Sequence, residues 1–110
     1  MYINIQQIEN VDKMLKTDMS ITIHDTEMRI ECNNKCRLLS HLLHKSGLVE
    51  VHCNKDGLFV IPFSTYTFSE ILIAFEDISF NPQWIIEFVE KYVENEFVMK
   101  TTFKVSEIEA

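Results

Sequence analysis

The sequence has only two glycines and two prolines in 110 residues, and its longest apolar runs are four or five residues. So few glycines cannot build a glycine-rich phosphate-binding loop, and no P-loop, GxGxxG or GxSxG string is present. The apolar runs are far shorter than the roughly 20 residues of a transmembrane helix. Flexible linkers and low-complexity segments are also excluded, because they are rich in glycine, proline or serine.

A secretion signal and a cysteine framework are lacking as well. The N-terminus, Met1-Tyr2-Ile3-Asn4-Ile5, has neither the basic region nor the apolar region of a signal peptide. The three cysteines are an odd number, and no two of them form a CxxC pair. These features predict a cytoplasmic protein with reduced thiols. We expect Cys36 and Cys53 to pack as small apolar side chains.

Positive charge is scarce. The chain has 10 Lys and Arg against 17 Asp and Glu, a net charge of −7. This balance disfavours binding to nucleic acid or to an anionic membrane, since both need clustered basic residues. Residues 70–110 carry nine acids and three bases, whereas residues 1–69 carry eight and seven. The negative charge is therefore concentrated in the C-terminal third.

Ordinary globular features fill the rest of the sequence, with 46% hydrophobic and 25% charged residues. Apolar spacing predicts helices over about 4–16, 35–46, 67–78 and 81–95. Thr67 and Glu70 have the spacing of a capping box, and Gly47 suits the position that follows a helix. Asn81-Pro82 offers an N-cap residue followed by the first helical residue.

Alternating apolar residues predict the strands. Residues 19–23 and 28–32 form a hairpin, residues 48–53 and 58–63 a second one, and residues 97–105 a fifth strand. Gly57 provides the left-handed residue of the second turn. The run Leu58–Ile61 is apolar on both faces, which favours a central strand covered on each side, or on one side by a partner.

The predicted order of elements is α-ββ-α-ββ-α-α-β. It indicates one α+β domain over residues 1–110, with an antiparallel or mixed sheet of about five strands and helices packed on it.

The pattern Cys32, Cys36, His41, His44 contains the residue types of a zinc site. At 100° per residue we expect Cys36 on the apolar side of its helix and the two histidines on the other. The loop between the two pairs is also too short for a zinc finger. We therefore expect no metal and no cofactor. Arg37, His41 and His44 share a helix face, which is either solvated surface or a site for one anionic group.

Catalytic residues are not expected. His52 and Cys53 are neighbours on a predicted strand, so their side chains point to opposite faces. His24 and Asp25 lie in a turn, where aspartate usually serves local hydrogen bonding. An enzyme or ligand-binding protein remains as an alternative if at least two histidines gather at a concave pocket. The four histidines concerned are His24, His41, His44 and His52.

The most informative segment is the predicted helix 81–95. Glu87, Glu90 and Glu94 form an acidic stripe, and like charges at this spacing repel by a few tenths of a kcal/mol. Further acids precede it, and aromatic residues on the same helix could anchor a partner. The candidate partner-binding residues are Glu70, Glu76, Asp77, Trp84, Glu87, Phe88, Glu90, Tyr92 and Glu94. The alternative is a buried helix with a solvated acidic side.

We therefore expect a small acidic binding protein that inhibits a basic partner, such as a nuclease toxin or another nucleic-acid-acting protein. An immunity protein, an antitoxin and a phage counter-defence protein all fit this description. The alternative from a different class is a homo-oligomeric structural or assembly protein, for example a homodimer.

Overall fold

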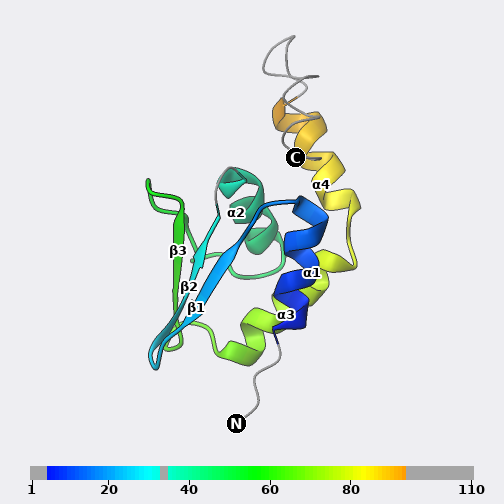
Figure 1. Ribbon diagram of the computed structural model, residues 1–110. Helices are drawn as coiled ribbons and strands as arrows, with labels where there is room; N and C mark the ends of the chain where they lie inside the picture. The colour runs from blue at the N-terminus through cyan, green and yellow to red at the C-terminus, as the bar shows by residue number, and fades with distance from the viewer. Residues whose placement is uncertain (1–4, 33–34, 94–110) are drawn as a thin grey trace.

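The computed structural model describes residues 5–32 and 35–93, with side chains up to Lys91 (Figure 1). Eight elements follow one another along these residues. They are α1 (Gln6–Leu15), β1 (Ser20–Ile23), β2 (Glu27–Glu31), α2 (Cys36–Lys45), β3 (Leu58–Pro62), α3 (Phe68–Ser79), α4 (Gln83–Phe88) and the π-helix η1 (Val89–Val93). The α+β class is confirmed. The predicted strand over residues 97–105 lies outside the described residues.

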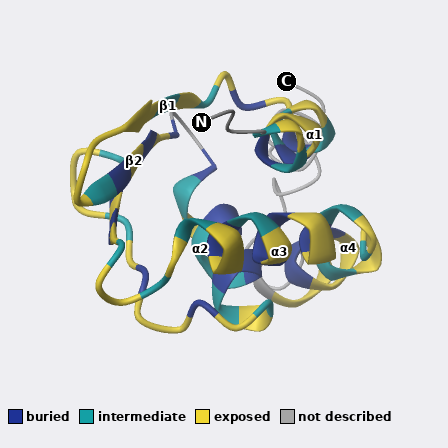
Figure 2. Ribbon diagram, turned by 90° about the horizontal axis from the view of Figure 1, so that it is seen from below, coloured by how far each residue is buried: buried dark blue, intermediate teal, exposed yellow. Residues whose placement is uncertain are grey.

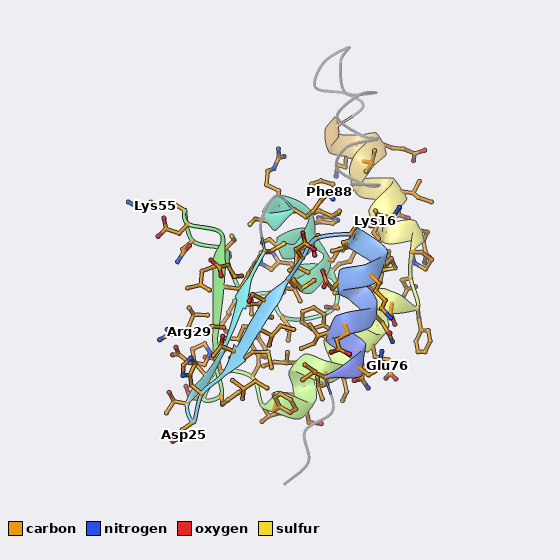
Figure 3. The ribbon with its side chains drawn as sticks, viewed as in Figure 1. Lys16, Asp25, Arg29, Lys55, Glu76 and Phe88 are labelled. Carbon is orange, nitrogen blue, oxygen red and sulfur yellow. The ribbon has the colours of Figure 1, made fainter. Side chains whose placement is uncertain are left out.

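The sheet has three antiparallel strands in the order β1-β2-β3. Met28 and Ile30 of β2 and Phe59 and Ile61 of β3 are buried on one face. Arg29 points to the other face, which no helix covers in the described part of the chain (Figure 3). The prediction of a one-sided hairpin over residues 19–32 is therefore confirmed. Among the described residues β3 lies at an edge of the sheet and helices cover only one of its faces, so the predicted central Leu58–Ile61 strand covered on both faces is not found in this part of the chain.

The second predicted hairpin is only partly present, which reduces the expected five strands. Residues 48–52 form no strand, and Cys53 alone bridges to Phe59. The reason is that amides of this segment already donate hydrogen bonds to nearby carbonyl groups. The Leu48 N–H bonds to the carbonyl of Leu43 at the end of α2, and the Val51 N–H bonds to that of Leu48. The turn itself forms as predicted, with Gly57 at φ +82°.

The end of α2 has the geometry of a Schellman motif. Gly47 adopts φ +109°, its N–H bonds to the His44 carbonyl, and the Leu48 N–H reaches back to Leu43. Leu43 and Leu48 are both buried, which supplies the apolar contact that accompanies this motif. The motif aims the chain back towards the core, so that residues 48–53 run past α2 instead of along β3.

Helices α1, α2 and α3 lie on the covered side of the sheet, and their buried sides face one another and the strands (Figure 2). The core combines Phe59 from the sheet with Leu39 from α2 and Phe75 from α3, each 0% exposed. Lys35, before α2, is 1% exposed, and its Nζ donates to the Leu15 carbonyl at 3.0 Å. This bond ties the start of α2 to the end of α1, where the helix dipole favours positive charge.

Helix α3 begins with the predicted capping box. The Glu70 N–H donates to Thr67 Oγ1 at 3.1 Å, and the Thr67 N–H donates to Glu70 Oε1 at 2.8 Å. The two side chains thus satisfy two amides that the helix cannot bond itself.

Replacing Thr67 with alanine should lower the free energy of unfolding by about 0.5–2 kcal/mol, because one of these amides loses its acceptor. Urea titration followed by circular dichroism measures this change. The control is Thr65→Ala, an exposed threonine two residues earlier that caps no helix. Equal effects of the two substitutions would contradict a role for the capping box.

Helix α4 differs from the predicted helix 81–95 in two respects. Pro82, not Asn81, is the N-cap residue, and the Asn81 side chain donates back to the Asp77 carbonyl at 2.7 Å. After Phe88 the helix widens into η1, so Val89–Val93 do not keep α-helical spacing. Among the helices that the structure describes, none is both long and apolar enough to cross a membrane.

Candidate functional site

The structure describes two of the three glutamates of the predicted acidic stripe. Glu87 lies beside α2, where its carboxylate is 3.8 Å from Lys45 Nζ. Glu90 is exposed in η1 and pairs with no basic residue that the structure describes. Glu94 lies outside the described residues. Of the two glutamates that the structure describes, Glu87 therefore has a basic neighbour on α2 and Glu90 does not.

Of the three aromatic residues proposed as anchors, the structure describes the side chains of two, one buried and one half-buried. Phe88 is 9% exposed and packs against α2, where its ring centroid lies 5.1 Å from that of His41. Trp84 is half-buried, and Lys45 Nζ lies 5.6 Å from its ring centroid. The side chain of Tyr92 lies outside the described part. Because Phe88 is buried together with Ile85 of α4 and Val89 of η1, its ring offers little surface to a partner.

Besides Ile86 of α4, exposed apolar residues occur on α3 and at its C-cap residue, Phe80. Ile73 is 61% exposed and Phe80 is 74% exposed, and their spacing of seven residues places them on one side of the helix. The opposite side contains the buried Ile71, Phe75 and Ile78. We use "acidic face" for the exposed side of α3 and define it by five residues. These are Glu70, Ile73, Glu76, Asp77 and Phe80.

The acidic face carries unbalanced negative charge. Glu76 and Asp77 lie between Ile73 and Phe80 along the helix, and neither forms an ion pair within residues 5–32 and 35–93. Glu76 lies on the helical side of the molecule, away from the sheet (Figure 3). Sequence analysis identified the acids but missed Ile73 and Phe80. The helical spacing could have identified them, because Ile73 and Phe80 are large apolar residues that lie opposite the buried stripe of α3.

A second site lies between α2 and the segment before β3. It is a cleft of about 480 Å³ that brings together residues from two distant parts of the sequence. We call it the histidine cleft, and its described lining residues are Cys36, Arg37, Ser40, His41, His44, His52, Cys53 and Asn54. Cys36 was expected on the opposite side of the helix from His41 and His44. The structure corrects this, because Cys36 lies at the border of the buried stripe and also lines the cleft.

Three of the four histidines surround the histidine cleft. His44 Nε2 lies 2.6 Å from the Val51 carbonyl, and because a carbonyl only accepts, Nε2 is the donor. The rings of His44 and His52 meet edge to face with centroids 5.0 Å apart. Burial lowers the pKa of His41, and the nearby charges of Lys45, His44 and Lys91 add to this effect, while Glu87 opposes it. His24 lies apart, in the hairpin between β1 and β2.

Two thiols in and beside the cleft, those of Cys53 and Cys32, have raised pKa values. Burial raises the pKa of Cys53 to about 12, and a hydrogen bond with the Cys36 thiol adds to this. Burial likewise raises the pKa of Cys32 to about 11. The Cys36 thiol donates to the Cys32 carbonyl at 3.0 Å. Because the thiolate is the nucleophile, Cys32 and Cys53 are not activated for nucleophilic chemistry.

The placement of the His, Cys, Asp and Glu side chains also bears on metal binding. In the described part of the chain, no three His, Cys, Asp or Glu side chains are placed so that they could hold one metal ion. The cleft thus brings together imidazoles and thiols without arranging them as a tetrahedral site.

Comparisons with known proteins add no assignment, since no protein-family model, no curated protein and no solved structure matches this chain.

Proposed function

We propose that this chain is a small acidic cytoplasmic protein that binds and inhibits a basic protein partner through the acidic face of α3. The observation that carries the proposal is the exposure of Phe80 and Ile73 among carboxylates that form no ion pair with the residues that the structure describes. Exposed aromatic and aliphatic residues supply the desolvated centre of an interface. Surrounding charges of one sign attract a partner of opposite sign and speed its association.

A basic partner fits this surface better than a second copy of the chain. In a twofold dimer the same patch lies on both subunits, so the carboxylates of Glu76 and Asp77 from both copies would be brought into one interface. Like charges placed opposite each other weaken an interface. The positively charged active site or substrate groove of a nuclease toxin, or of another nucleic-acid-acting protein, has the complementary charge. The roles of immunity protein, antitoxin and phage counter-defence protein all require such a contact.

The test compares two variants of equal net charge as bait in lysate of the source cells. Glu76→Gln with Asp77→Asn neutralises the acidic face, and Glu9→Gln with Asp25→Asn neutralises exposed acids on α1 and in the hairpin turn. We expect a basic protein that the wild type and the second variant retain and the first variant loses. With the purified pair, the first variant should bind roughly 3- to 30-fold more weakly, mainly through slower association.

Two results would contradict the proposal. One is an affinity that depends neither on salt nor on the Glu76 and Asp77 substitutions, because contacts between exposed charges are screened by salt. The other is a concentration-dependent dimer in sedimentation that Phe80→Lys dissociates, which would assign the acidic face to self-association and favour the assembly protein instead.

A further inference from the structure

All three cysteines of the chain lie at one place in the fold, where α2 begins beside the turn before β3. Cys32 follows β2 directly, Cys36 is the first residue of α2, and Cys53 precedes the turn. Cys32 is 1% exposed, whereas Cys36 and Cys53 are half-buried and line the histidine cleft. The two thiols that a small reactant can reach are therefore those of Cys36 and Cys53.

The contact of Cys53 with β3 directs its side chain towards α2. Cys53 forms an antiparallel bridge with Phe59, and residues directly opposite each other in such a pair point to the same face of a sheet. Phe59 is 0% exposed and faces the helices. The Cys53 thiol is therefore on the covered side of the sheet, where Cys36 opens α2.

The Cys36 sulfur packs against the turn that follows Cys53. If Gly57 of this turn carried a Cβ atom, that atom would lie 3.5 Å from Cys36 Sγ. The thiols of Cys36 and Cys53 are within hydrogen-bonding reach of each other. Two sulfur atoms from segments that are distant in the sequence thus meet at the wall of the histidine cleft.

We propose that Cys36 and Cys53 form a reversible disulfide bond by exchange with a small-molecule disulfide such as oxidised glutathione. One thiolate of the pair attacks a sulfur of the small disulfide, which forms a mixed disulfide and releases one small thiol. The other thiolate then attacks the protein sulfur of the mixed disulfide and releases the second small thiol. The protein dithiol loses two electrons and two protons, and the small disulfide takes them up as two thiols.

The raised pKa of Cys53 slows this exchange without opposing its equilibrium. Thiolate is the attacking species, so the rate increases as the pH rises. The other titratable groups beside Cys53 are the thiols of Cys36 and Cys32 and, in the lining of the cleft, one arginine and three histidines. Disulfides that are easily reduced belong to pairs whose reduced form is stabilised. Since a raised pKa gives the Cys53 thiolate no such stabilisation, the bridge should persist until a strong reductant is added.

The bridge ties the segment 48–53 to α2 by a covalent bond. In the reduced protein this segment is held to the helix by hydrogen bonds, among them the one from His44 Nε2 to the Val51 carbonyl at 2.6 Å. A cross-link restricts the unfolded chain, so the oxidised protein should melt roughly 5 °C or more above the reduced protein. The inference does not depend on the proposed function, since neither cysteine belongs to the acidic face.

The experiment maps the bridge in the folded wild-type protein. The protein is incubated with oxidised glutathione at pH 8.5, remaining thiols are blocked with N-ethylmaleimide in urea, and tryptic peptides are identified by mass spectrometry. Trypsin cleaves after lysine and arginine, so the three cysteines fall in separate peptides, 30–35, 36–37 and 46–55. We expect peptide 36–37 to be linked to peptide 46–55 in most of the monomeric protein, and peptide 30–35 to carry the blocking group. Dithiothreitol should restore all three thiols and the lower melting temperature.

Variants and an unfolded control show whether the fold selects this pair. Cys36→Ser and Cys53→Ser should each give a mixed disulfide with glutathione and no internal bridge. Cys32→Ala should still form the bridge, because the buried thiol takes no part in it. Wild type that is oxidised in urea should give a mixture that includes bridges to Cys32, and this control needs no variant to fold.

Four results would overturn the proposal. Three concern the main product in the folded protein, namely a bridge that contains Cys32, separate glutathione adducts on Cys36 and Cys53, or three free thiols. The fourth is a melting temperature that does not rise on oxidation, because the native geometry would then not accommodate the bridge.

Discussion

Replacing Phe59 with alanine should lower the free energy of unfolding by about 3–5 kcal/mol, the usual cost of removing a buried phenylalanine ring. Phe59 is 0% exposed and lies in β3 opposite Ile30 of β2, where it faces the helices. Its loss leaves a cavity between the sheet and the helical layer. Small domains have only about 5–15 kcal/mol of stability, so this single change removes a large part of it.

Val60 provides the control, because it is the next residue of the same strand and points to the uncovered face. It is 38% exposed, and Val60→Ala should cost less than about 1 kcal/mol. Urea denaturation of both variants measures the difference. Similar losses would mean that both faces of β3 are covered, as the apolar run Leu58–Ile61 had suggested.

Replacing Phe80 with alanine should weaken binding to the basic partner by about 2 kcal/mol or more, roughly 30-fold in Kd. Phe80 is 74% exposed, so its removal opens no cavity in the core and should leave stability nearly unchanged. The loss should appear in the dissociation rate, since it removes contacts from the complex. Neutralising Glu76 and Asp77, by contrast, should slow association and reduce the salt dependence.

Val49 offers a matched apolar control for this measurement. It is 59% exposed and lies in the segment between α2 and β3, away from the acidic face. Val49→Ala should leave the affinity unchanged. A similar loss at Val49 and Phe80, or no loss at Phe80, would show that the exposed ring of α3 is not part of the interface.

The elements that the sequence predicted well are those governed by local interactions. The capping box at Thr67 and Glu70 and the left-handed Gly47 both formed, because each depends on residues within a few positions of one another. The first hairpin formed for a similar reason, since alternation over residues 19–32 and a short turn fix its register. Segment 48–53 could not be predicted, because its amides bond to the end of α2 and to each other instead of to β3.

The candidate sites likewise combine features that the sequence predicts with features that depend on tertiary packing. Acidic residues on α3 could be identified from the sequence, but the exposure of Phe80 and the burial of Phe88 depend on how α3 and α4 pack. The apolar spacing is similar in the segments that form α3 and α4. It does not show whether the ring of Phe80 or that of Phe88 is buried in the core. The contact between α2 and α4 decides it, because Phe88 packs against His41 and Arg37.

The excess of negative charge in the C-terminal third was determined by the sequence itself, because net charge needs no fold. Which acids have a basic partner among the described residues was decided by the tertiary structure, because it places Glu87 near Lys45 and leaves Glu76 and Asp77 on the acidic face. The histidine cleft was decided entirely by the tertiary structure. His41 and His52 meet there because the Schellman motif after α2 turns the chain back along that helix, a contact between segments that no local pattern encodes.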